Sequence, residues 1–315
     1  MRNTTAKNLK LRLPYAPKDP ILLADWLEIL ALISPDGNSS DGELERALQA
    51  AAIYESDDEV EVACLDTFRE LEERAKAAKQ AYPFTVKNKL LKQRGTWQSY
   101  PAYVFCLCLS YFGCPEQEQS KAFPRRWFEH LSRDAAMHYL GREGKAVRFG
   151  SPRLKEELPK GFKDSINKIC NYLNEGKGFK GKVQSEKDDY VDIIAWKHFP
   201  DELPGKLIMF GNCASQIDWD KGKARELYPD DFCRDWLIEP PRCKIIKSLF
   251  IPHRPAYDQF IKQLGYAGII FDRCRIAYWS YSVGSVSSQK KQKNFFIYDE
   301  IADWAQKKLT ILDGK

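Results

Sequence analysis

The sequence predicts an α/β protein, in which a central mixed β-sheet flanked by helices follows a mostly helical N-terminal module. Up to residue 115, most apolar residues recur at helical spacing. From residue 116 on, helical segments alternate with short apolar runs that are typical of strands. Their order is helix, strand, strand hairpin, helix, strand, helix, strand, which calls for a mixed sheet between helices. We therefore expect two domains, 1–115 and 116–315.

Four helices are expected in the N-terminal module. The segment 20–33, PILLADWLEILALI, has helical spacing and begins with proline. The turn cluster SPDGNSSDG ends it and offers Ser40 or Asp41 as the N-cap of the next helix. A third helix covers about 58–79, with apolar residues on one face and charges on the other. A fourth, at 100–113, is apolar all round and therefore buried.

The second domain begins with a helix at residue 124, and its elements follow each other closely. The pair YVDIIAWKHF and KLIMFGNC is joined by the turn-rich PDELPG and predicts a strand hairpin. The other expected elements are the strand AVRF, a helix at 159–174, a charged helix near 218–236, the strand IIKSLFIPH, a helix near 255–264, the strand AGIIFDRCRIAYWS and a last helix from 299.

Charge is distributed unevenly along the chain. Residues 36–75 contain thirteen Asp or Glu and three Arg, a local charge of −10, while the whole chain carries +5 and the remainder therefore +15. The asymmetry favours a polyanionic partner for the larger part, and a solvated charged face is the alternative. Nine cysteines scattered through apolar segments predict reduced, buried thiols. Because no signal-peptide run and no stretch of 18 uncharged apolar residues occurs, we expect a cytoplasmic protein with no membrane contact.

Polar residues interrupt the two strands of the expected hairpin. Asp192 lies within a run that is otherwise apolar over 191–196, and an uncompensated buried carboxylate is costly relative to the stability of a domain. A Mg²⁺ ion would compensate it, since Mg²⁺ takes oxygen ligands from one or two carboxylates with water and phosphate. Asn212 stands where the next strand runs out. We expect the hairpin to place it beside Asp192.

These motifs resemble the PD-(D/E)xK superfamily of restriction-endonuclease-like nucleases, over residues of about 124–280. That family has a Glu on a leading helix, an Asp within the next strand, and a strand ending in Glu or Gln, x, Lys. Here FEHLSRDAA supplies Glu129, YVDIIAW supplies Asp192 and LIMFGNCAS supplies Asn212. The resemblance implies a restriction-endonuclease-like fold in which Glu129, Asp192 and Asn212 hold Mg²⁺ or Mn²⁺.

The chain departs from the family pattern at the lysine. Ala214 occupies its position, and Asn212 is a weaker metal ligand than a carboxylate. Some members carry the lysine on the following helix, where IDWDKGKAREL offers Lys223, with Lys221 second. Lys197, at the end of the first hairpin strand, is a third candidate. A decayed nuclease fold that binds nucleic acid or a protein partner is therefore the alternative to an active enzyme.

The activity implied by the resemblance is metal-dependent hydrolysis of phosphodiester bonds in nucleic acid, with DNA favoured. The metal would lower the pKa of bound water, and the lysine would orient or deprotonate that water. The resemblance alone also implies a nuclease effector of bacterial anti-phage defence or restriction. Because such an enzyme would need control, the acidic helical module is expected to dock a regulatory protein.

Several basic residues are candidates for phosphate contacts, because guanidinium and ammonium groups pair with phosphate oxygens. They are Arg153, Lys197, Arg254, Arg273, Arg275, Lys290 and Lys291. A structural ion pair between Asp272 and Arg273, and a solvated loop around Lys290, are the alternatives. A third functional class, a hydrolase with Cys213 as nucleophile and His253 as base, is also open.

Overall fold

The computed structural model describes residues 11–114, 124–153, 155, 157–181, 189–286 and 296–313. The chain divides into two compact units, one formed by Met1–Phe112 with Tyr298–Lys315 and the other by Gly113–Ile297. The division after Phe112 lies three residues before the expected one. The C-terminal helix was expected in the second domain but belongs to the first unit, where the Trp304 ring packs edge-on against Phe105 at 5.4 Å.

The first unit consists of helices and one small antiparallel sheet, with strand order β1-β3-β2. The helices expected at 20–33, 58–79 and 100–113 are confirmed to within about a residue, whereas the three short strands were not anticipated. The elements are α1 (Pro20–Ile33), β1 (Asn38–Ser40), α2 (Asp41–Ala51), α3 (Asp57–Ala78), η1 (Lys79–Ala81), β2 (Phe84–Lys87), β3 (Leu90–Gln93), η2 (Trp97–Ser99), α4 (Pro101–Phe112) and α10 (Phe296–Asp313).

Local signals in the sequence explain where the first helices begin and how they pack. Ser40 rather than Asp41 is the N-cap of α2, in a capping box in which Glu43 Oε2 accepts from the Ser40 backbone N at 2.8 Å. A buried charge cluster joins α3 to α1. Arg74 is fully buried and donates to Asp25 Oδ1 at 2.6 Å and to Glu28 Oε2 at 2.9 Å.

The second unit is built on a five-stranded mixed sheet of order β10-β9-β7-β6-β4, in which β6 is antiparallel to both of its neighbours and β7, β9 and β10 are parallel. The mixed sheet and its hairpin are thus confirmed. The elements are α5 (Pro124–Tyr139), β4 (Lys145–Arg148), α6 (Phe162–Leu173), β5 (Lys177–Phe179), β6 (Ile193–Lys197), β7 (Leu207–Cys213), η3 (Trp219–Lys221), η4 (Lys223–Arg225), α7 (Pro229–Trp236), β8 (Leu237–Glu239), β9 (Ile246–Phe250), α8 (Tyr257–Ala267), β10 (Ile269–Phe271) and α9 (Arg273–Val286).

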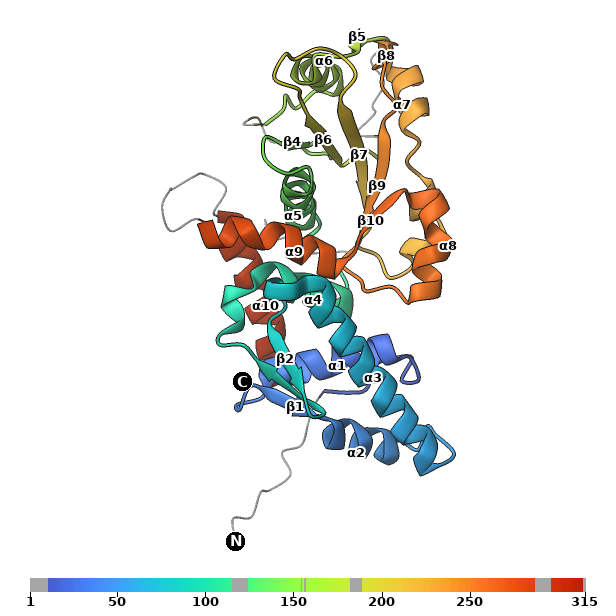
Figure 1. Cartoon of the computed structure of the whole chain (residues 1–315), viewed down its shortest axis with the longest axis vertical. Helices are drawn as coiled ribbons and strands as arrows, with labels where there is room; N and C mark the ends of the chain where they lie inside the picture. The colour runs from blue at the N-terminus through green and yellow to red at the C-terminus, as the bar shows by residue number, and fades with distance from the viewer. Residues whose placement is uncertain are drawn as a thin grey trace. The chain divides into compact units, whose positions relative to one another are not determined.

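Helices cover both faces of this sheet, and Figure 1 shows α5 and α8 on opposite sides of it. On one face, Ile194 of β6 and Phe210 of β7 pack with α6 and α7, and Leu249 of β9 packs with α8. The other face is covered by α5, against which α9 packs. Side chains that alternate along β6 and β7 therefore point either to α5 or to the α6, α7 and α8 layer.

Two expected elements are wrong. The charged helix near 218–236 is replaced by the short 3-10 turns η3 and η4, and α7 starts only at Pro229. The strand expected at AGIIFDRCRIAYWS ends at Phe271, and the remainder is helix α9. The reason is a capping interaction, since Asp272 Oδ1 accepts from the backbone N of Arg275 at 2.9 Å and so starts the helix.

Two further expectations concern the state of the cysteines and contact with a membrane. All nine cysteines are free thiols, and six of them are buried, as expected. Cys106 and Cys108 lie within the apolar helix α4 and not at a zinc-like spacing. Among the described residues, we find no helix whose length and apolar character would allow it to span a lipid bilayer.

Candidate functional site

Asp192 directly precedes strand β6, which begins at Ile193. Its backbone N donates to the carbonyl of Gly211 at 2.8 Å, and the next residue, Ile193, is also paired with Gly211. Two residues opposite one form a β-bulge, a feature that re-aims side chains. Val191 packs in the same core as Ile194, on the α6 side. The bulge therefore turns Asp192 to the other face, toward α5.

Two carboxylates converge at Gly150. A Cβ added to Gly150 would lie 2.7 Å from Oε2 of Glu129, on α5, and 3.0 Å from Oδ1 of Asp192. The Gly150 backbone N donates to the carbonyl of Asp192 at 3.1 Å. The backbone N of Cys213, at the end of β7, donates to Asp192 Oδ2 at 2.7 Å and holds that carboxylate in place. The helix and the strand expected to supply Glu129 and Asp192 thus bring them together.

Two arginines share this site. Arg148, at the end of β4, is 2% exposed and lies 3.3 Å from Glu129 Oε2 through Nη1. Its guanidinium also donates to the carbonyls of Gly150 and Pro152, which fixes its position. Burial and the positive charge of Arg148 lower the pKa of Arg126, while Glu129 opposes this shift. Glu129 therefore interacts electrostatically with both Arg126 and Arg148.

The Cys213 thiol faces the same carboxylates. Burial, followed by the negative charges of Asp192 and Glu129, raises its pKa well above the usual value. A thiol kept protonated in this way is a poor nucleophile. The ring of His253 lies 2.9 Å from the carbonyl of Gln216. These contacts give no support to a hydrolase built on Cys213 and His253.

Asn212 does not lie where the sequence suggested. It pairs in register with Leu249, and both Leu249 and Ala214 belong to the core on the α8 side. Alternation along β7 therefore points Asn212 away from the face that carries Cys213 and the Asp192 carboxylate. Asn212 is 5% exposed, and its Nδ2 has no hydrogen-bond partner among the described residues. The bulge at Asp192 shifts the pairing of the two strands by one residue, and this shift explains why Asn212 does not lie beside the Asp192 carboxylate.

The candidate lysines lie away from the converging carboxylates. Lys223 and Lys221 sit on 3-10 turns that pack on the α8 side of the sheet, and Lys223 Nζ pairs with Glu226 at 2.8 Å. Lys197 donates to the carbonyl of Leu140 at 3.1 Å. It stands at the far end of β6, about 16 Å along the strand. Arg148 Nη1, by contrast, lies 3.3 Å from Glu129 Oε2.

Most of the predicted phosphate contacts are engaged inside the protein. Arg153 is 4% exposed, and its guanidinium stacks 4.3 Å from the ring centre of Phe149. Arg254 pairs with Asp272 at 2.5 Å, and Arg273 is fully buried. A structural ion pair, here between Asp272 and Arg254, therefore fits the contacts of these residues better than phosphate binding.

The last three residues predicted to contact phosphate are Arg275, Lys290 and Lys291. Arg275 donates to the carbonyl of Ile270 at 2.7 Å and stacks 4.6 Å from the ring centre of Phe260. Lys290 and Lys291 lie outside the residues that the structure describes. No phosphate-binding surface therefore emerges from the described members of the predicted set.

The donor set at Gly150 fits a hard divalent cation. Among the described residues, no group of three or more His, Cys, Asp or Glu side chains is arranged to hold a metal. Two carboxylates are nevertheless sufficient protein ligands for Mg²⁺, which completes its shell with water and substrate phosphate. The missing side chain of Gly150 leaves room beside Glu129 and Asp192. These two residues would hold the cation, with no contribution from Asn212.

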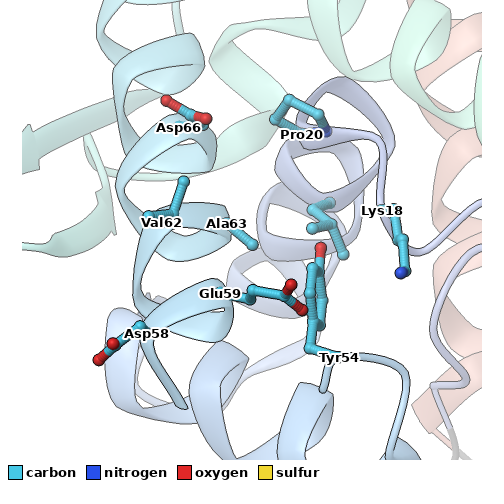
Figure 2. A pocket seen from close by; sticks show the side chains of 9 residues that line it. Lys18, Pro20, Tyr54, Asp58, Glu59, Val62, Ala63 and Asp66 are labelled. Carbon is cyan, nitrogen blue, oxygen red and sulfur yellow. The ribbon is translucent and has the colours of Figure 1, made fainter. Parts of the chain in front are cut away.

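A separate cavity of about 420 Å³ lies in the first unit, between the start of α1 and the side of α3. Figure 2 shows Tyr54 between Glu59 and Lys18, and Lys18 Nζ is 5.2 Å from the centre of the Tyr54 ring. The remaining lining residues are Pro20, Leu23, Asp58, Val62, Ala63 and Asp66. Three carboxylates against one lysine disfavour phosphate and favour a cationic group with an apolar part.

Comparison of the chain with protein-family models, with curated proteins and with solved structures found no match. At the candidate site, the sequence pointed to Glu129 and Asp192 but gave no indication of Gly150 or Arg148. The signals in the sequence that could have indicated them are the charge of Asp192 within an apolar run and the glycine that follows AVRF.

Proposed function

We propose that this chain is a metal-dependent nuclease with a restriction-endonuclease-like fold, which cleaves phosphodiester bonds in nucleic acid and DNA in particular. The observation that carries the proposal is the convergence of Glu129 Oε2 and Asp192 Oδ1 within 3.0 Å of one point beside Gly150. The two residues come from a leading helix and a following strand of the sheet, which is the pattern on which the resemblance rests. A mixed sheet between helices also agrees with it.

Each residue at the site has a role that follows from its contacts. Glu129 and Asp192 would bind Mg²⁺ or Mn²⁺, which when bound lowers the pKa of water and neutralises charge on phosphate. The Cys213 N–H keeps one Asp192 oxygen occupied and so orients the other toward Gly150. Arg148, held by two backbone carbonyls, would contact the phosphate and stabilise the charge that develops on it. It takes the place of the lysine that the family pattern contains.

Cleavage assays with supercoiled plasmid and labelled single strands test this proposal. Full-length protein should cut in Mg²⁺ or Mn²⁺ and be inactive with a chelator. Asp192→Asn and Glu129→Gln should each lower the rate by at least about 100-fold, because each removes a metal ligand. Glu239→Gln is the matched control, since that carboxylate is 57% exposed and pairs with Lys177 at the surface. Equal rates in all three variants would refute the proposal.

A decayed nuclease fold is the second candidate, and two observations favour it. Asn212 and the candidate Lys223 lie on the α8 side of the sheet, and the Arg148 guanidinium lies beside Glu129. This candidate predicts nucleic-acid binding without cleavage in Mg²⁺ or Mn²⁺. The same assays, read together with a gel-shift measurement, separate the two.

The cellular setting is proposed from the resemblance alone: a nuclease effector of anti-phage defence or restriction, acting in the cytoplasm. The acidic first unit would dock a regulatory protein. The cavity beside Tyr54 supports this, because Asp58, Glu59 and Asp66 surround an apolar floor that suits a lysine or arginine of such a partner. A protein that is fully active and toxic by itself would contradict the regulatory part of the proposal.

A further inference from the structure

A surface on the α8 side of the second unit combines exposed tyrosines with cations. It consists of Arg225, Tyr228, Lys247, Lys262 and Tyr266, and we call it the tyrosine–cation surface. Tyr228 and Tyr266 are 56% and 46% exposed. The Arg225 guanidinium lies 4.0 Å from the centre of the Tyr266 ring, and Lys247 Nζ lies 5.0 Å from the centre of the Tyr228 ring. Each tyrosine is thus next to a cation.

The five residues form one continuous surface. Lys247 Nζ donates at 2.8 Å to the carbonyl of Ala224, the residue before Arg225. Gly268, two residues after Tyr266, lies so close to β9 that an added Cβ would be 2.2 Å from the Lys247 carbonyl oxygen. Lys262 lies one helical turn before Tyr266 on α8. The turn η4, the start of β9 and the end of α8 therefore meet here.

The cations of this surface are not paired with carboxylates in the described part of the chain. In the described part of the chain, no carboxylate lies within ion-pair distance of Arg225, Lys247 or Lys262; Arg225 and Lys247 contact rings and a carbonyl instead. The neighbouring carboxylate of Glu226 is engaged by Lys223. Arg225 and Lys262 are exposed and remain available to an anionic polymer, and the exposed rings of Tyr228 and Tyr266 can stack with bases.

We propose that the tyrosine–cation surface binds single-stranded nucleic acid, with bases stacked on Tyr228 and Tyr266 and phosphates paired with Arg225 and Lys262. Base stacking on aromatic rings tolerates any sequence, so the surface would hold a strand without reading it. The proposal uses no residue of the Gly150 site. It adds a strand-holding surface to the proposed nuclease and is tested independently of cleavage.

The stacking contacts are tested by fluorescence anisotropy with a labelled oligo(dT) of about 12 nucleotides, a length within the usual site sizes for single strands. A chelator is present so that cleavage is prevented. Tyr228→Ala and Tyr266→Ala should each weaken binding by about fivefold or more, whereas Tyr→Phe at either position should keep it. Tyr15→Ala is the matched control, since Tyr15 is 76% exposed and lies in the other unit.

The phosphate contacts are tested by the salt dependence of the same binding. Arg225→Gln and Lys262→Gln should each reduce the slope of log affinity against log salt by about 0.7. Arg142→Gln, which removes an exposed charge with no ring beneath it in the described structure, should leave the slope unchanged. Alanine variants of the tyrosines that bind like the wild type would overturn the proposal, and so would equal competition by inorganic polyphosphate, which has no bases.

Binding and cleavage can fail separately. A chain that cleaves DNA while its tyrosine variants bind normally would keep the nuclease and overturn this surface. A chain that never cleaves but loses oligo(dT) binding on Tyr228→Ala and Tyr266→Ala would support the surface and contradict the proposed function.

Discussion

At the scale of single residues, Gly150 lacks the side chain that would separate Glu129 from Asp192. Its φ lies outside the left-handed region, so alanine is compatible with the backbone. The added Cβ would nevertheless stand 2.7 Å from Glu129 Oε2, closer than a carbon and an oxygen can approach without movement. The space beside the two carboxylates is thus a property of this one position.

Gly150→Ala should therefore leave the fold intact and remove the site. We expect near-native circular dichroism and a melting temperature within a few degrees of the wild type, with cation binding and cleavage both lost. Gly265→Ala is the control, because an added Cβ there meets nothing within 4 Å. Wild-type cleavage by Gly150→Ala would show that the cation does not occupy this space.

The sequence identified the two carboxylates at this scale but not their surroundings. Asp192 stood out because a charge inside an apolar run requires compensation. Asn212 was misplaced because one extra residue in a bulge reverses which side chains share a face, and a bulge leaves no clear mark in sequence. Arg148 was missed because an arginine at the end of a short strand looks like any surface cation.

At the scale of elements, α1 and α3 are joined by charges as well as by apolar contacts. Arg74 of α3 is fully buried and pairs with Asp25 and Glu28 of α1. Arg74→Met should cost about 3–5 kcal/mol of unfolding free energy, because two buried carboxylates lose the cation that they share. Arg69→Met, which breaks an exposed pair with Asp66, should cost less than about 1 kcal/mol. Urea unfolding measures both, and equal losses would contradict the importance of the buried cluster.

Elements with a strong periodicity were predictable, and short ones were not. The helix at 20–33 and the hairpin of β6 and β7 follow directly from apolar spacing. Three-residue strands such as β1 and β10 depend on their partners in the sheet, which local sequence does not specify. The change from β10 to α9 depends on a single cap, Asp272, which stands between two stretches rich in apolar residues.

At the scale of the whole molecule, buried thiols link stability to alkaline pH in both units. Burial raises the pKa of Cys64 in the first unit and of Cys233 in the second to about 12. Both thiols stay protonated in the folded state but ionise near pH 9 once unfolded. Their stabilisation is therefore complete below pH 9 and is lost as the pH rises from 9 toward 12.

The free energy of unfolding should accordingly fall between pH 8 and pH 10, by up to about 1.4 kcal/mol per pH unit for each thiol once the pH is above 9. Urea titrations at several pH values in the presence of a reductant measure this. Cys64→Ala should lower stability at pH 8 but reduce its dependence on pH. A free energy that does not change from pH 8 to pH 10 would contradict the burial of these thiols.

Mn²⁺ binding followed by electron paramagnetic resonance measures whether Glu129 and Asp192 hold one divalent cation together. We predict a single site in the wild type, loss of that site in Asp192→Asn and in Glu129→Gln, and retention in Glu239→Gln. A wild-type chain that binds no Mn²⁺ even with oligonucleotide present, or an Asp192→Asn variant that binds it as well as the wild type does, would contradict the account.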